Sequence, residues 1–286
     1  MDGLSAETTK KGRLQRACLA LLDEHEADGA LPTSNRFLFY ELVSRGVLPK
    51  SYPGKSRTPA QDVSEATTSL REVGIIPWSW IVDETRALHY WRYAPSVYQY
   101  ALEMLPSARI DLWQGEPPPL ILCESRSLAG VMQDIASTYL CPIAATNGQT
   151  GGFLHTDVGP LIREGGSFAP RRVLYFGDLD LSGGYIEENT RGVLETYGAL
   201  DWKRLAITNE QVRERGLTEV EKKDNRFKPP RTFPAVETEA LRQQEIQRIL
   251  LEALEEDVPQ PLSEILEREQ LQRVLVRERL GSDDDQ

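Results

Sequence analysis

Hydrophobic residues recur at helical spacing in three segments of the first 75 residues. In segment 13–27 they lie three and four positions apart, which places them on one face of an amphipathic helix. A polar cap precedes a second such segment at 37–46, a proline opens a third at 59–74, and each ends at a glycine. The apolar segment 75–82 then predicts a short pair of strands. Three helices followed by a strand pair is the order of a winged-helix domain.

The hydrophobic pattern changes after a proline-rich stretch at 115–119, which we interpret as a linker between domains at 1–112 and 113–286. Beyond it, short continuous apolar runs alternate with helical segments. These runs are LILC at 120–123, PIAA at 142–145, VLYF at 173–176 and RLAI at 204–207. Such runs are typical of strands buried on both faces, so the alternation predicts a largely parallel sheet. The expected fold class is multidomain α/β, with a winged-helix domain first and helices flanking the sheet and closing the chain.

Acidic residues follow two of the predicted strands directly. Glu124 comes after the first, and Asp178 and Asp180 come after the third. Ligand sites of open parallel sheets lie at the carboxyl ends of the strands, and alternation places Asp178 and Asp180 on the same side of the chain. If the two strands are neighbours, the three carboxylates meet and form a set of oxygen ligands that suits Mg²⁺. The three histidines and three cysteines are too scattered for a zinc site or a disulfide scaffold.

A strand-end glutamate followed by a later Asp-x-Asp resembles the Toprim domain of topoisomerases, primases and related nucleases. The resemblance covers about residues 118–210. It implies that Glu124, Asp178 and Asp180 bind Mg²⁺, with Mn²⁺ as an alternative, for phosphodiester chemistry. Some Toprim nucleases carry a further acid for a second metal, so Glu237 and Glu239 are secondary candidates. Stabilisation by the dipole of the helix that follows would also explain these two acids.

The segment from Arg36 to Tyr40, RFLFY, resembles the Arg-x-x-[FY]-Tyr signature in the winged-helix domain of the topoisomerase VI A subunit and its meiotic DNA-cleaving relatives. In that family a Toprim domain follows in the same chain. The resemblance implies that Tyr40 attacks double-stranded DNA, that Arg36 assists it, and that the metal site of one subunit serves the tyrosine of a second copy. A homodimer and an ATPase partner subunit are implied in the same way.

Two departures from that family leave the nucleophile open. Leu181 stands where a proline usually follows the second aspartate, and Ser125 stands where lysine is frequent. The motif YFGDLDLSG is closer to the nuclease subunit of bacterial anti-plasmid systems related to SMC proteins. In such a nuclease, a metal-activated water could cleave the strand. Tyr40 would then be a buried aromatic residue of the core.

Composition and charge restrict the partners. The 286 residues include 33 basic and 44 acidic side chains, for a net charge of −11. Phosphate contacts must therefore come from local basic groups, including Lys10, Lys11, Arg57 and an expected exposed loop at 222–231. No apolar run reaches the roughly 18 residues of a membrane helix, and the first 13 residues lack the apolar region of a secretory signal. We expect no membrane partner and a cytoplasmic or nucleoid-associated location.

Two alternative functions fit parts of the sequence. The run DLDLS at 178–182 approximates the motif of haloacid-dehalogenase-type phosphatases, in which Asp178 would be a covalent nucleophile and Asp180 an acid/base. That interpretation leaves Glu124 unexplained, and the terminal acids 283–285 have no apolar strand before them. The other alternative is a non-catalytic winged-helix adaptor that binds DNA.

Overall fold

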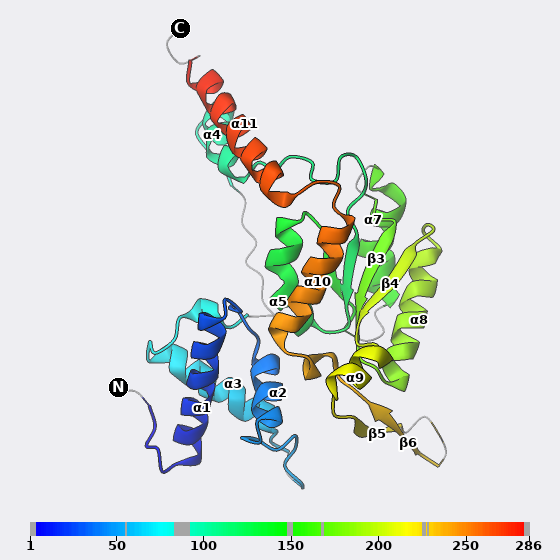
Figure 1. Cartoon of the computed structure of the whole chain (residues 1–286). Coiled ribbons are helices and arrows are strands. Elements are labelled where there is room, and N and C mark those ends of the chain that lie inside the picture. The colour runs from blue at the N-terminus through cyan, green and yellow to red at the C-terminus, as the bar shows by residue number, and fades with distance from the viewer. Residues whose placement is uncertain are drawn as a thin grey trace.

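The N-terminal part is a bundle of three helices (Figure 1). The computed structural model describes residues 4–54, 56–82, 92–147, 151–166, 169–224, 227 and 229–282. The three helices are α1 (Lys10–Ala27), α2 (Asn35–Ser44) and α3 (Pro59–Glu72). Side chains of Thr9, Ser34 and Thr58 cap their first turns, as polar N-caps do. Their apolar faces meet in one buried cluster, so the helices expected from the spacing are present.

The strand pair expected at 75–82 is wrong. Trp78–Trp80 forms a short 3₁₀ helix, η1, and Ile81 makes an isolated parallel bridge with Thr33. Pro77 has no N–H group for a strand ladder, which disfavours a hairpin here. The guanidinium of Arg71 on α3 donates to the Ile81 carbonyl and lies 5.2 Å from the centre of the Trp78 ring. These contacts hold the segment against α3. Residues 83–91, where a wing could continue, lie outside the described residues.

The second part is a four-stranded parallel sheet with helices on both faces. Its strands are β1 (Leu120–Cys123), β2 (Ile143–Ala145), β3 (Arg172–Phe176) and β4 (Asp201–Ala206), in the order β2-β1-β3-β4. Figure 1 shows α5 (Arg126–Thr138) and α10 (Gln243–Asp257) on one face, and α7 (Gly159–Glu164) and α8 (Leu181–Glu195) on the other. Shorter helices α6 (Gly151–Phe153), η3 (Leu154–Val158) and α9 (Asn209–Arg215) complete it. The expected α/β architecture with a parallel sheet is present.

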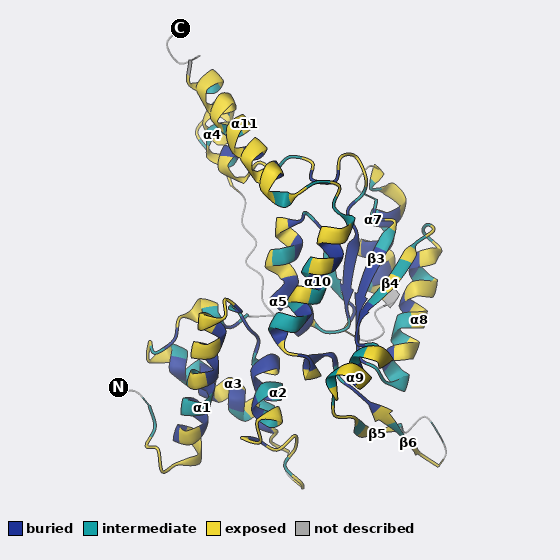
Figure 2. Cartoon of the chain, in the orientation of Figure 1, coloured by how far each residue is buried: buried dark blue, intermediate teal, exposed yellow. Residues whose placement is uncertain are grey.

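Alternation along the strands explains why these sequences are apolar throughout. Ile121 and Phe176 belong to the cluster under α5 and α10, whereas Leu122 and Tyr175 belong to the cluster under α7 and α8. Successive side chains point to opposite faces of a sheet, and both faces are covered here. The central strands β1 and β3 therefore have almost no exposed side chains (Figure 2).

The exposed loop expected at 222–231 is instead part of a hairpin. Strand β5 (Val220–Asp224) pairs in antiparallel fashion with β6 (Arg231–Ala235), so that Lys222 lies opposite Phe233. The polar composition of β5 hid this strand, because its stability comes from the ladder and not from buried side chains. Asn225, Arg226 and Lys228 lie outside the described residues. The hairpin leads into an antiparallel bridge between Val236 and Leu179.

A two-helix arm projects from the sheet domain (Figure 1). It consists of α4 (Val97–Met104), the short η2 (Leu105–Ser107) and α11 (Leu262–Ser282), and most of its surface is exposed (Figure 2). Tyr98 on α4 donates a hydrogen bond to the Leu280 carbonyl on α11.

Within the described residues, no helix has both the length and the apolar character needed to cross a membrane.

Candidate functional site

Glu124 and Asp178 meet at the carboxyl edge of the sheet. Their strands β1 and β3 are neighbours, and Cys123 is aligned with Phe176. The Glu124 N–H donates to the Phe176 carbonyl at 2.8 Å, and Glu124 Oε2 accepts from the Asp178 N–H at 2.9 Å. Two residues 54 positions apart in the sequence are therefore in direct contact. The adjacency that the sequence required for a shared site is present.

The two aspartates use their oxygens differently. Asp178 Oδ1 accepts hydrogen bonds from the Thr238 N–H at 2.9 Å and from its hydroxyl at 3.1 Å. Asp180 caps α8, since its Oδ1 accepts from the Gly183 N–H at 2.6 Å. Its Oδ2 pairs with Lys222 Nζ of the hairpin at 2.5 Å. The hairpin therefore supplies the cation that neutralises Asp180.

Glu239 lies beside this edge and is almost entirely buried. It belongs to the short helix η5 (Thr238–Ala240). Its Oε1 accepts from Arg36 Nε at 2.7 Å and from the Ser125 hydroxyl at 3.0 Å, whereas its Oε2 is buried without a hydrogen-bond partner. Arg36 is on α2, so this ion pair joins the two parts of the chain.

Tyr40 approaches the same edge from α2. Its hydroxyl donates a hydrogen bond to Glu237, which also accepts from Lys50 Nζ at 3.1 Å. The Tyr40 ring has Arg36 at 5.7 Å and Lys50 at 5.8 Å from its centre. The structure thus brings every candidate catalytic residue of the sequence into one region, within a single chain.

Burial and mutual repulsion change the protonation of these acids. Burial, followed by the charge of Asp178, raises the pKa of Glu124 to about 7. Burial also raises the pKa of Glu239 to about 7, against the opposing effect of Arg36. The pKa of Asp178 is raised as well, again mainly by burial. For Asp180, burial is outweighed by Lys222 and the N–H groups of α8, so its pKa is lowered.

Tyr40 is held in its neutral form. Burial and the hydrogen bond to Glu237 raise the pKa of its phenol well above the ordinary value. Burial would raise the pKa of Glu237, but the hydrogen bonds from Tyr40 and Lys50 outweigh this effect and lower it. Glu237 is therefore a carboxylate in direct contact with a phenol, which is the geometry of a base and a latent nucleophile.

The donor set suits a hard cation by its chemistry. The region holds five acids, Glu124, Asp178, Asp180, Glu237 and Glu239, and three cations, Arg36, Lys50 and Lys222. Among the described residues, no three His, Cys, Asp or Glu side chains are already arranged around a common metal position. Glu239 Oε2 is nevertheless buried without a hydrogen-bond partner, and the five acids outnumber the three cations, so the region holds a surplus of acidic groups. Oxygen-rich, electron-donating surroundings of this kind fit Mg²⁺ or Mn²⁺.

Three contributors were not assigned to the site from the sequence. Lys222 and Lys50 were visible only as members of basic clusters, and Thr238 carried no signal other than its place between two glutamates. The contacts of Lys222 and Thr238 with the two aspartates depend on the hairpin and on the bridge between Leu179 and Val236, which bring residues about 40–60 positions apart together. Lys50 contacts Glu237, which is 187 positions away in the sequence.

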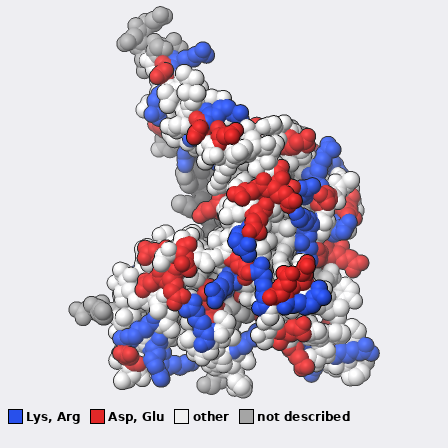
Figure 3. All heavy atoms as spheres, viewed as in Figure 1, with Lys and Arg blue, Asp and Glu red and all other residues white. Residues whose placement is uncertain are grey.

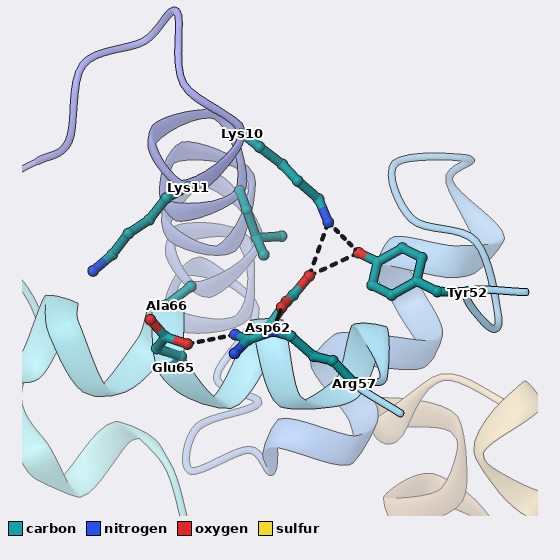
Figure 4. Close-up of a pocket in the computed structure, with 8 residues that line it drawn as sticks. Lys10, Lys11, Tyr52, Arg57, Asp62, Glu65 and Ala66 are labelled. Atoms are coloured by element: carbon teal, nitrogen blue, oxygen red, sulfur yellow. Dashed lines mark hydrogen bonds and ion pairs between the residues drawn. The ribbon is translucent and has the colours of Figure 1, made fainter. Parts of the chain in front are cut away.

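The basic residues expected to contact phosphate near the N-terminus are mostly engaged elsewhere. They line a cavity of about 310 Å³ between α1 and α3 (Figure 4). Asp62 pairs there with Lys10 at 3.0 Å and with Arg57, while Arg57 also pairs with Glu65. Lys11 points away from this network. Acidic and basic side chains are also interspersed over much of the face in Figure 3, which shows no broad basic surface.

No family model, curated protein or solved structure matches the chain. Any activity must therefore be inferred from the side chains described above.

Proposed function

We propose that this protein is a Mg²⁺-dependent enzyme that cleaves double-stranded DNA. The observation that carries the proposal is the contact between Glu124 Oε2 and the Asp178 N–H, with Asp180 following on the same edge. A strand-end glutamate beside an Asp-x-Asp is the arrangement that the resemblance to Toprim domains requires. The carboxyl edge of a parallel sheet is also where such sites form in general.

Glu124, Asp178 and Asp180 would hold the metal ion, with Mn²⁺ as an alternative to Mg²⁺. The ion would polarise a phosphate and lower the pKa of a bound water. Arg36 and Lys50 flank Tyr40 and would bind phosphate oxygens near it. Glu237, already in contact with the Tyr40 hydroxyl, would accept a proton from the attacking group.

The identity of the attacking group depends on Tyr40. Its neutral phenol is a weak nucleophile, but Glu237 can take its proton and two cations can stabilise the resulting phenolate. If Tyr40 attacks, protein becomes covalently joined to a DNA end, and the Tyr40→Phe variant forms no adduct. If water attacks, Tyr40→Phe cuts DNA and wild-type protein leaves no adduct.

Binding of DNA by the N-terminal helices, as in a winged-helix domain, belongs to the same proposal. The resemblance also implies a homodimer, an ATPase partner and a cytoplasmic or nucleoid location. Because Tyr40 and Arg36 contact Glu237 and Glu239 of their own chain, we favour cleavage completed within one subunit.

The geometry favours metal binding over the phosphatase alternative. A phosphatase of this type would use Asp178 and Asp180 alone, whereas Glu124 Oε2 is in direct contact with the Asp178 N–H. Residues 283–285, which that alternative would need, lie outside the described residues. Glu124 is also left without a role.

Cleavage of plasmid DNA in the presence and absence of Mg²⁺ tests the proposal. We expect Glu124→Gln and Asp178→Asn to reduce cleavage by at least about 100-fold while DNA binding in a mobility-shift assay is retained. Glu252→Gln, a matched change at an exposed acid of α10, should leave cleavage unchanged. DNA binding without metal-dependent cleavage in the wild type would instead identify the adaptor, and hydrolysis of a small phosphate ester would identify the phosphatase.

A further inference from the structure

The arm carries an apolar stripe on the face of α11 that turns away from the sheet domain. Leu271, Val274 and Leu275 are 60%, 44% and 50% exposed. They are spaced three and four positions apart and so lie on one side of the helix. Exposed apolar residues are ordinary when scattered, but a contiguous stripe on a projecting helix indicates a contact surface.

The opposite face of α11 is already engaged. Ile265 is fully buried, and the Glu269 carboxylate accepts from the Ile110 N–H and pairs with Arg109 at 2.8 Å. Farther along, the Leu280 carbonyl accepts the hydrogen bond from Tyr98. The orientation of α11 is therefore fixed from its base to its tip, and the apolar stripe faces outward.

The charges of α11 are divided between its two halves. Residues 262–270 carry three glutamates and one arginine, a net charge of 1 − 3 = −2. Residues 271–281 carry three arginines and one glutamate, a net charge of 3 − 1 = +2. Two such helices repel each other when parallel and attract each other when antiparallel.

We propose that α11 pairs with α11 of a second copy in antiparallel orientation, through this stripe. Placing Leu271 of one copy opposite Leu275 of the other fixes the register. The same register then sets Glu267 opposite Arg279, and Arg268 opposite Glu278. Because the pairing is two-fold symmetric, each of these contacts occurs twice.

A second copy fits this surface better than an unrelated protein. An unrelated partner would not require the two halves of α11 to carry opposite charges. Antiparallel self-pairing does require opposite charges in the two halves and apolar residues between them, and both are present. A helix of 21 residues is about 30 Å long, enough for several turns of antiparallel contact. This inference does not depend on the proposed DNA cleavage.

Sedimentation equilibrium of the full chain across a dilution series tests the interface. We expect the wild type to be a dimer and Leu275→Asp to raise its dissociation constant by about 100-fold or more, since both copies lose a buried leucine. Val276→Asp, the same kind of change at an exposed residue next to Leu275 in the chain and therefore on a different side of the helix, should leave the dimer intact. Far-UV circular dichroism checks that each variant is folded. A monomeric wild type, or a Leu275→Asp variant that remains a dimer, overturns the proposal.

A charge exchange tests the register. Glu267→Arg and Arg279→Glu should each weaken the dimer, because each places like charges opposite one another in both symmetric contacts. The double variant should restore the wild-type dissociation constant. Failure of the double variant to recover association overturns the antiparallel register. The two proposals fail independently. If Glu124→Gln forms the dimer but the expected loss of DNA cleavage is not seen, only the proposed function is contradicted.

Discussion

At the scale of the residue, the site is defined by carboxylic acids that are difficult to ionise. Glu124 and Glu239 have pKa values raised to about 7 by burial, and each also feels the charge of Asp178. Any cation that binds beside these carboxylates stabilises their charged form, whether it is the ammonium group of Lys222 or a metal ion, and a proton neutralises it. Protons and Mg²⁺ should therefore compete for the same oxygens.

The raised pKa of Glu124 predicts a pH dependence of stability. Between about pH 4.5 and 7 the folded protein holds a proton that the unfolded chain has lost, so this group's contribution to stability is full below that range and disappears as the pH rises through it. Between pH 4.5 and 7 the free energy of unfolding of the wild type should therefore fall by about 2–3 kcal/mol more than that of Glu124→Gln. Urea unfolding at several pH values measures this difference, with Glu252→Gln as control. Identical pH profiles for wild type and Glu124→Gln would contradict the assignment.

The Lys222 ammonium predicts a specific competition with metal. Its contact with Asp180 Oδ2 must be given up when that oxygen binds a cation. Lys222→Met should therefore lower the Mg²⁺ concentration that half-saturates the protein by about tenfold, seen as a larger Mg²⁺-dependent rise in melting temperature. Lys223→Met, the next residue of β5 with its side chain on the other face, should behave as wild type. An equal effect from both variants would argue against a direct role of Lys222.

At the scale of the element, the start of α8 is fitted closely against the site. A Cβ added at Gly183 would lie 2.4 Å from the Asp178 carbonyl oxygen and 3.4 Å from Glu124 Oε2. A Cβ added at the adjacent Gly184 would meet nothing within 4 Å. Only the first glycine is thus required for the helix to approach the strand ends.

The two glycines predict opposite changes in stability. Gly183→Ala should lower the free energy of unfolding by about 1–3 kcal/mol, because backbone must move to accept the methyl group. Gly184→Ala should raise it by up to about 1 kcal/mol, since alanine favours the helix. Urea denaturation of both variants measures the difference. Equal effects of the two changes would contradict the close approach.

At the scale of the whole molecule, the two parts of the chain are joined through α2 and the residues just before it, which contact η5 and the first residue of α10. Phe37 of α2 belongs to the buried cluster of the sheet domain. The Gln243 amide donates to the carbonyls of Ala30 at 2.5 Å and Pro32 at 2.9 Å. The pair between Arg36 and Glu239 lies beside these contacts, so the candidate site coincides with the junction.

Breaking the Arg36–Glu239 pair should therefore destabilise the molecule in a pH-dependent way. Arg36→Met leaves a buried carboxylate without its cation, and we expect a loss of about 1–3 kcal/mol at pH 8. The loss should shrink at pH 5, where Glu239, with a pKa of about 7, is protonated. Arg45→Met removes a comparable pair with Glu24 at the surface and should cost less than about 1 kcal/mol at either pH. Urea unfolding measures both variants, and equal losses at the two pH values would refute the explanation.

The sequence alone was sufficient to predict those helices and strands whose formation depends on residues close to one another in the chain. Helical spacing located α1, α2 and α3, and uninterrupted apolar runs located β1, β2, β3 and the end of β4, because period and burial are local signals. The polar first half of β4, from Asp201, was missed. Strand ends also placed Glu124 and Asp178 on one edge, given that their strands are adjacent.

Contacts between distant segments could not be obtained in this way. The contact of Lys222 with Asp180 and the pairing of Arg36 with Glu239 both depend on partners far along the chain. Residue order records which groups are present, whereas burial and the protonation of each acid depend on which groups surround it after folding. The acids at the strand ends could therefore be predicted from the sequence. Their pKa values and ion-pair partners were determined only by the packing of the two parts of the chain.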